Sequence, residues 1–265
     1  MASSIFQFSD RQETIRKLLA TRGRLSVAQL AAQMKVAAMT IRRDLSALEK
    51  AGLLTRTHGG CVMQSPFVSE LPFPEKERLR QKHKTAIAGE TIHQLKRGES
   101  VYLDTGTTAL LVARRLPPNL GLRVFTNNLR IAMELFGRTD LEVTVYGGTL
   151  ARLNPDLTGE IALGHIQQFR IDVAVVGGDA LDTGRSEFYS ADGSTARLSR
   201  AVQQQADRVI VAMDSSKFGK RSLTVAGRLG PGATLITDDE VSRDDRTALR
   251  RTGAKIILAD PNQNT

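Results

Sequence analysis

The chain has 265 residues, of which 41% are apolar and 25% are charged, a composition typical of a globular protein with room for two domains. Its only cysteine, Cys61, excludes an intrachain disulfide bond. No apolar run approaches the roughly 18 residues that a membrane helix needs, and the first residues do not look like a signal peptide. We therefore expect a cytoplasmic protein that does not bind membranes.

The net charge of +9 is unevenly distributed along the chain. Residues 1–62 contain ten Lys and Arg against four Asp and Glu, a net charge of +6, whereas the other 203 residues contain 27 against 24, a net charge of +3. A small basic region beside a larger, nearly neutral one indicates that one end of the chain binds an anionic polymer such as nucleic acid. A basic surface that serves only solubility is the alternative.

Two short helices are expected at the start of the basic region. Residues 10–22 carry an apolar stripe, and Asp10 with Glu13 three residues later can form a capping box. Ser26 can cap a second helix over residues 27–34. Helices this short and this close together are expected to pack against each other.

The third expected helix starts near Met39 and ends at Gly52, which suits the left-handed residue after a helix. Ile41, Leu45 and Leu48 recur at i, i+4 and i+7 and should face the core. A short strand and a glycine-rich tip follow, which completes the plan of a winged helix-turn-helix. The outward and tip residues, with the cap of the second helix, are candidates for DNA contacts: Ser26, Thr40, Arg42, Arg43, Ser46, Arg56, His58 and Gly59.

This region carries a specific resemblance. The run TIRRDL from Thr40 to Leu45, followed by the LExxG and RxHGG patterns that end at Gly52 and Gly60, resembles the signature of the DeoR family of bacterial sugar-metabolism repressors. The resemblance implies a repressor that binds operator DNA. The family usually has Ser where this chain has Ala37, and we expect the loss of that cap to cost about 1 kcal/mol.

The remainder of the chain is expected to be an α/β domain. Residues 63–80 contain three prolines and are predicted to be a linker between a domain at 1–62 and one at 81–265; a helix is expected over residues 82–96. Seven short apolar runs then alternate with helical stretches, which favours a mostly parallel sheet covered on both faces. The runs are 101–103, 122–125, 143–146, 173–176, 209–212, 235–236 and 256–258, and the helical stretches are 108–116, 129–136, 157–169, 195–206 and 243–251.

Polar or glycine-rich turns follow six of these strands, at the sheet edge where ligands bind in open α/β folds. Gly106 allows close approach of the backbone, and Thr107 and Thr108 begin a helix whose N-terminus can hold a phosphate or carboxylate; an ordinary helix cap without a ligand is the alternative. Lys217 either supplies a cation to the same anion or is a solvated surface lysine. The candidates for contacts with sugar hydroxyls, unless they only stabilise turns, are Asp104, Asn127, Asn128 and Asp179.

These turns also resemble the effector domain of the DeoR family, which is similar in fold to pentose-phosphate isomerases. The resemblance implies a phosphorylated sugar as effector, with residues 105–108 as its phosphate loop and Lys217 nearby. One departure is the run GGDALD at 177–182, where the family commonly has a Gly-x-Asp-Gly-Ile-Asp-like sequence. The expected effector-binding residues are Asp104, Thr105, Gly106, Thr107, Thr108, Thr126, Asn127, Asn128, Gly147, Gly148, Asp179 and Lys217.

The sequence thus predicts a sequence-specific transcriptional repressor of a carbohydrate operon that is not an enzyme. No zinc-ligand spacing, Walker loop or GxSxG motif occurs, so we expect no metal or cofactor. Because one winged helix gives limited affinity, we expect a homodimer or homotetramer on repeated half-sites. A sugar-phosphate isomerase with an accessory DNA-binding arm, and a basic domain that binds nucleic acid without sequence preference, are the alternatives.

Overall fold

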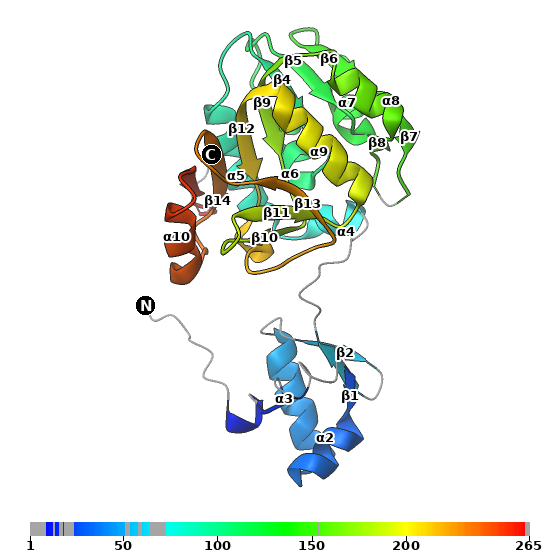
Figure 1. Cartoon of the computed structure of the whole chain (residues 1–265), viewed down its shortest axis with the longest axis vertical. Helices are drawn as coiled ribbons and strands as arrows, with labels where there is room; N and C mark the ends of the chain where they lie inside the picture. The colour runs from blue at the N-terminus through cyan, green and yellow to red at the C-terminus, as the bar shows by residue number, and fades with distance from the viewer. Residues whose placement is uncertain are drawn as a thin grey trace. The chain divides into compact units, whose positions relative to one another are not determined.

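The computed structural model of the chain (Figure 1) divides into two compact units, Met1–Pro66 and Phe67–Thr265. It describes residues 9–12, 14, 15, 18, 24–50, 54–57, 60–63, 73–152 and 154–262. Within these ranges no helix is long and apolar enough to cross a membrane. Each unit has a hydrophobic core of its own.

The first unit is a small helical domain with a three-stranded sheet. Its helices are α2 (Val27–Met34) and α3 (Ala38–Lys50), and residues 10–12, 14, 15 and 18 are also helical. The strands pair antiparallel in the order β1-β3-β2; they are β1 (Arg24–Ser26), β2 (Leu54–Thr57) and β3 (Gly60–Met63). This is the predicted winged helix-turn-helix plan with one additional strand.

The core of this unit confirms the predicted helix faces. Ile41, Leu45 and Leu48 are each at most 1% exposed, and they pack in one cluster with the buried Cys61. Burial raises the pKa of the Cys61 thiol to about 11, so this residue packs as a small apolar side chain. Strand β1 was not predicted, because three residues are too few to show a pattern; pairing with β3 far along the chain creates it.

The cap of the first helix differs from the prediction by one residue. Helix begins at Asp10, and the capping box is formed by Ser9 and Gln12. The Gln12 amide donates to Ser9 Oγ at 3.3 Å, and the Ser9 amide donates to Gln12 Oε1 at 3.1 Å. A serine hydroxyl can do this as well as a carboxylate; Glu13 lies outside the described residues.

A seven-stranded sheet forms the centre of the second unit, and every neighbouring pair of its strands is parallel. Each of the seven predicted apolar runs overlaps one of these strands; the runs 122–125 and 143–146 each extend one residue beyond it. In sheet order they are β15 (Lys255–Ala259), β14 (Ala233–Asp238), β12 (Ala206–Ala212), β9 (Ile171–Val176), β4 (Ser100–Leu103), β5 (Arg123–Thr126) and β6 (Glu142–Val145).

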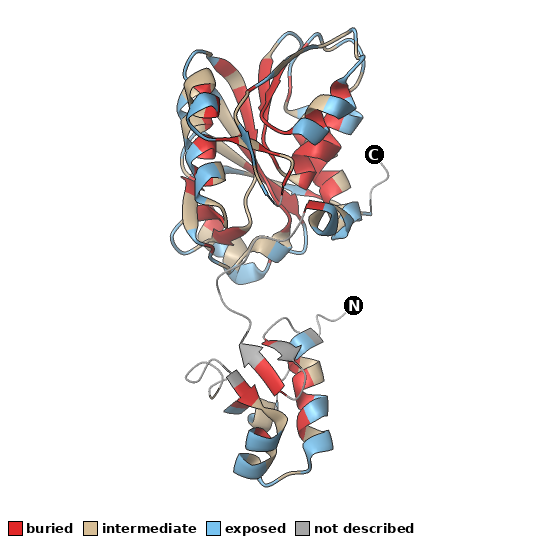
Figure 2. Cartoon of the chain, turned by 90° about the vertical axis from the view of Figure 1, so that its right-hand side faces the viewer, coloured by how far each residue is buried: buried red, intermediate tan, exposed pale blue. Residues whose placement is uncertain are grey.

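Helices cover both faces of the sheet, as the alternating pattern predicts (Figures 1 and 2). Successive strand residues face opposite cores: Val101 and Leu103 belong to one cluster and Tyr102 to the other. The first face is covered by α5 (Gln81–His93), α6 (Thr107–Arg115) and α7 (Leu129–Leu135), and the second by α8 (Glu160–Ile166), α9 (Gly193–Gln205) and α10 (Arg243–Arg250).

Three features of the second unit differ from the sequence expectations. Residues 73–78, within the expected linker, form helix α4 (Phe73–Arg78), whose Phe73 is buried in the first core. The helix expected over 157–169 starts only at Glu160, because residues 157–158 form β8 and pair with β7 (Thr149–Leu150). A second, antiparallel sheet was not predicted; it contains β10 (Ala180–Asp182), β11 (Glu187–Ser190) and β13 (Thr224–Arg228).

Candidate functional site

The outer face of α3 presents two adjacent arginines. Arg42 and Arg43 are exposed, and Thr40 and Ser46 beside them are half-buried. The opposite face of the helix is fixed in the core, so these side chains project from a rigid element. A basic, exposed helix face of this kind suits a groove lined by phosphates and base edges.

Helix α3 is also tied to the first helix by a charged contact. Asp44 is 5% exposed, and its carboxylate accepts hydrogen bonds from Arg11 Nε at 2.5 Å and Nη2 at 3.2 Å, and from Gln12 Nε2 at 3.3 Å. This bidentate pair raises the pKa of Arg11. Asp44, the acidic neighbour of Arg42 and Arg43, is thereby neutralised by Arg11 within the unit.

Of the other predicted DNA contacts, only Ser26 has a side chain among the described residues. Ser26 caps α2, since its Oγ accepts from the Gln29 amide at 3.1 Å and its own amide donates to Gln29 Oε1 at 2.8 Å. Arg56 lies in β2, but its side chain, like His58 and Gly59, lies outside the described residues. Ala37 offers only its carbonyl to the start of α3, consistent with the expected loss of a side-chain cap.

A cavity in the second unit lies at the carboxyl ends of β4, β9 and β12. Three of the six predicted turns line it, and together they contribute Asp104, Thr105, Gly106, Thr107, Thr108, Asp179 and Lys217. Gly106 has an ordinary φ of −80°, and a Cβ added there would meet nothing within 4 Å. Neither backbone strain nor packing within the chain therefore requires glycine at this position, which is consistent with room kept for a ligand.

The most informative lining residue, Lys84 on α5, was not among the predicted site residues. It is 4% exposed, and its Nζ donates to Thr107 Oγ1 at 3.1 Å and to the carbonyl of Lys76. Burial lowers its pKa to about 8. Lys84 lies three positions before the buried Ile87 in the helix expected over residues 82–96, so the two share one helix face.

The cavity contains charges of both signs. Lys76, Arg80 and Lys217 line it with Lys84, opposite the carboxylates of Asp104, Asp179 and Asp214. The Arg80 guanidinium lies 3.1 Å from Asp214, and Lys76 Nζ lies 3.9 Å from Asp179. Burial raises the pKa of Asp104, whose carboxylate accepts from the Gly177 amide at 3.2 Å. Lys84 and Lys217 take part in neither of these two ion pairs, so they are the cations of the lining that an anion can use.

Three polar residues expected in the site face the protein interior instead. Thr126, Asn127 and Asn128 are 0% exposed and do not line the cavity. Thr126 donates to the Leu103 carbonyl at 2.8 Å, and Asn127 to the Leu157 carbonyl at 2.8 Å. Asn128 donates to the Thr105 carbonyl at 3.3 Å and caps α7. Of the three, Asn128 is the one that bonds to the loop carrying Thr105.

The two glycines expected in the site shape the β7–β8 hairpin and do not line the cavity. Gly148 has φ +149°, and a Cβ there would lie 2.4 Å from the Thr158 carbonyl oxygen. The Gly147 amide donates to His165 Nδ1 at 3.2 Å. Close backbone approach therefore explains Gly148 without a ligand.

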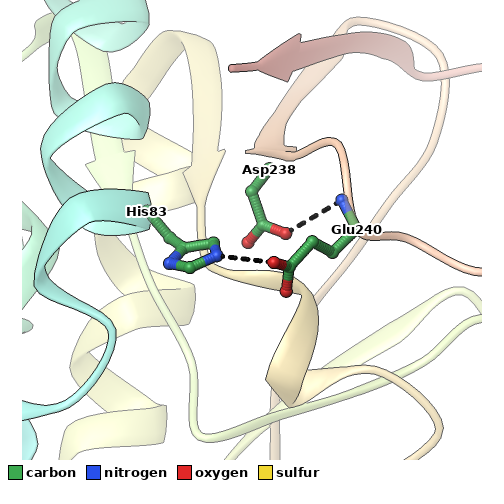
Figure 3. Close-up of side chains that lie close together, drawn as sticks. All are labelled: His83, Asp238 and Glu240. Carbon is green, nitrogen blue, oxygen red and sulfur yellow. Dashed lines mark hydrogen bonds and ion pairs between the residues drawn. The ribbon is translucent and has the colours of Figure 1, made fainter. Parts of the chain in front are cut away.

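A cluster of possible metal ligands lies beside the cavity (Figure 3), where His83 and Asp238 point toward Glu240. His83 Nε2 and Glu240 Oε1 are 3.0 Å apart. Arg80 Nη2 donates to Glu240 Oε2 at 2.7 Å and to Asp238 Oδ1 at 3.2 Å. Because the Arg80 guanidinium already occupies one oxygen of each carboxylate, we interpret the cluster as an ion-pair network that fixes Arg80 at the cavity wall, and we do not assign it a metal.

Comparisons with known proteins match both units. The profile of the DeoR-like helix-turn-helix domain matches residues 11–67, and that of the DeoR C terminal sensor domain matches residues 79–239. The transcriptional repressor AccR of Agrobacterium fabrum is 32% identical over 95% of this chain and 97% of its own. The glycerol-3-phosphate regulon repressor of Escherichia coli is 30% identical over 87% of this chain and 90% of its own.

Among solved structures, the ribose 5-phosphate isomerase A of Methanocaldococcus jannaschii covers 51% of this chain and 53% of its own, at 18% identity and a TM-score of 0.37. A similarity this low carries no information on activity. The matches to both domain profiles and to repressors along nearly their whole length show that this chain is a member of the DeoR family of transcriptional regulators.

Proposed function

We propose that this protein is an operator-binding repressor whose DNA affinity is set by a phosphorylated sugar, or a related small phosphate ester, bound in the cavity of the second unit. The observation that carries the ligand assignment is the buried Lys84, bonded to Thr107 at the first residue of α6. The same proposal assigns DNA binding to residues 1–62 and effector sensing to residues 81–265.

The arrangement around α6 supplies what a phosphate monoester needs. The helix N-terminus offers free backbone N–H groups and a partial positive charge, and the hydroxyls of Thr107 and Thr108 lie beside it at the cavity wall. Lys84 and Lys217 add two cations. Carboxylates across the cavity, such as Asp179, can accept hydrogen bonds from sugar hydroxyls. One of the similar repressors is named for a glycerol-3-phosphate regulon, which agrees with a small phosphate ester as ligand.

Burial of the Lys84 charge before any ligand binds is the strongest part of this argument. A lysine that is 4% exposed loses hydration, and its two hydrogen-bond acceptors, a hydroxyl and a carbonyl, are both neutral. An anion in the cavity compensates for that loss. Proteins bury such charges mainly where a function uses them.

On the DNA side, Arg42 and Arg43 supply the exposed cations of α3, and Thr40 and Ser46 supply shorter polar contacts. We propose that α3 enters the major groove of an operator half-site. A gel-shift titration at fixed salt, with DNA from upstream of the protein's own gene and a scrambled sequence of equal length, tests this assignment. We expect at least about 1,000-fold preference for the upstream DNA; equal affinity contradicts a specific regulator and favours non-specific binding.

We propose further that the cavity binds without catalysing a reaction, as the names of the relatives as regulators suggest. The alternative of a sugar-phosphate isomerase requires a carboxylate positioned as a general base. Incubation of the protein with ribose 5-phosphate, followed by a ketose assay, separates the two functions. No ribulose 5-phosphate should form above the rate in buffer alone; turnover that is lost in Asp104→Asn would establish the isomerase instead.

A further inference from the structure

An exposed apolar face lies at the edge of the second unit. Ten large apolar side chains are exposed in the described part of the chain, and Phe136, Met133 and Ile161 are 83%, 69% and 63% exposed. Six of the ten belong to elements grouped around the edge strand β6, and we call them the edge face: Leu129, Met133, Phe136, Val145, Leu150 and Ile161.

The centre of the edge face is one stripe along α7. Leu129, Met133 and Phe136 follow one another at spacings of four and three residues, so they lie on one side of the helix. The buried side of the same helix faces the sheet. In β6, Val143 packs against the core beneath α7, and Val145, two residues later, points to the same face of the sheet. The helix stripe and Val145 therefore share one side of the unit.

The β7–β8 hairpin extends this surface. The Leu129 amide donates to the Pro155 carbonyl at 2.8 Å, which joins the start of α7 to the hairpin turn. Leu150 lies in β7 of that hairpin. Ile161 lies in contact distance of the β6–β7 connection, since a Cβ added at Gly147 would be 3.8 Å from its Cγ2. Helices α7 and α8 cover opposite faces of the sheet, and Figure 1 shows both of them, with β7, near the edge formed by β6. The edge face therefore wraps around this edge of the sheet.

The edge face is large enough to form an interface. With about 200 Å² for each fully exposed large side chain, the six exposures correspond to roughly 700 Å² of surface. The largest patch on a typical monomer is about 300–600 Å², and a stable complex buries about 800 Å² on each partner. Strand β6 is also an open edge of the sheet, and its sequence Glu-Val-Thr-Val has no lysine or proline to protect that edge.

We propose that the edge face is a homodimer interface, covered by the same face of a second copy of this chain. The choice of a second copy rests on the proposed function, because each chain carries a single recognition helix and a specific operator needs two half-sites. The charged residues of α7 are paired within the chain, because Arg130 Nη2 lies 3.5 Å from Glu77 Oε2 and Arg114 Nε donates to Glu134 Oε2 at 2.9 Å. The face therefore presents mainly apolar side chains to a partner, which suits the same apolar face of a second copy related by a twofold axis.

Sedimentation equilibrium of the full chain without DNA tests the proposal. The test variant carries Met133→Glu and Phe136→Glu, which place charges in the centre of the face. The control is Leu223→Glu, because Leu223 is 77% exposed and lies outside the face. We expect the wild type and the control to be dimers at micromolar concentration, and the dissociation constant of the test variant to rise at least about 100-fold. Far-ultraviolet circular dichroism spectra should not differ between the three proteins, because all three substituted side chains are exposed and the fold of the monomer does not depend on them.

Three outcomes would overturn the proposal. One is a wild-type protein that is monomeric at these concentrations, which would mean that another part of the chain or another protein covers the face. The others are a test variant that dimerises as the wild type does, and a control that dissociates equally. Failure of the proposed function looks different: the wild type then forms the predicted dimer but does not distinguish operator from scrambled DNA.

Discussion

Replacement of the buried Lys84 by methionine is expected to stabilise the ligand-free protein and to abolish anion binding. Methionine retains the unbranched aliphatic part of the side chain and removes the charge. The physical reason is that Lys84 is 4% exposed and has only neutral hydrogen-bond acceptors, the Thr107 hydroxyl and the Lys76 carbonyl. Its charge is therefore maintained at the expense of folding stability.

The magnitude follows from the pKa of this group, which burial lowers from 10.5 to about 8. At about 1.4 kcal/mol per pKa unit, charged Lys84 costs the folded state about 3 kcal/mol at pH 7. The lost hydrogen bond to Thr107 offsets about 1 kcal/mol, so we expect Lys84→Met to gain about 2 kcal/mol. Between pH 8 and 10.5 the unfolded chain binds the extra proton, so wild-type stability rises with pH there and the advantage of the variant shrinks.

Urea denaturation in phosphate-free buffer at pH 7 and pH 10 measures this difference. Lys82→Met is the matched control, because Lys82 is exposed on the same helix and should change stability by less than about 0.5 kcal/mol. Calorimetric titration with inorganic phosphate should show binding to the wild type and the control but not to Lys84→Met. A variant that is less stable than the wild type at pH 7, or whose advantage is the same at pH 10, would refute the reasoning.

Four further predictions concern other parts of the chain. Arg43→Ala should weaken operator binding by at least about 1 kcal/mol in a gel-shift assay, with an unchanged melting temperature because Arg43 is exposed; an unchanged affinity would remove it from the interface. Asn128→Ala should cost about 2–3 kcal/mol in urea denaturation, since a fully buried side chain and a helix cap are lost; a loss below 1 kcal/mol would contradict this role. Gly148→Ala should cost about 1–3 kcal/mol through its positive φ and the clash with the hairpin backbone, and a neutral effect would show that the hairpin adjusts. The Cys61 thiol, with its pKa raised to about 11, should react with Ellman's reagent at pH 8 only as the protein unfolds in urea, and rapid reaction of the folded protein would contradict its burial.

The parts of the fold that could be predicted from the sequence are those in which the spacing of apolar residues determines the secondary structure. Each strand of the large sheet contains a short apolar run, and helical stretches alternate with these runs along the chain, so the parallel sheet was predictable from this pattern. The second sheet was not, because strands of three to five residues such as β10 and β13 acquire their pairing from distant parts of the chain. Residues 157–158 were expected in a helix for the same reason, since their conformation comes from pairing with β7.

The site was predictable only in part, because turn residues of the same types serve different purposes. Thr107 and Asn128 both begin helices after strands of one sheet. The first lines the cavity, whereas the second is turned inward by hydrogen bonds to the Thr105 carbonyl and to Asp156. Arg80 and Lys84 reach the cavity from the start of α5, and the position of this helix is set by its packing against β12, β14 and β15, which are distant in the sequence.

The central claim is that a phosphate ester in the cavity controls DNA binding, and fluorescence anisotropy tests it directly. Labelled DNA from upstream of the protein's own gene is titrated with wild-type protein or Lys217→Ala, with and without glycerol 3-phosphate or ribose 5-phosphate; unphosphorylated glycerol is the control. We expect at least one ester to change the wild-type affinity by about 5-fold or more, and Lys217→Ala to bind DNA normally without responding. An affinity that no ester changes, or a full response in Lys217→Ala, would contradict the account.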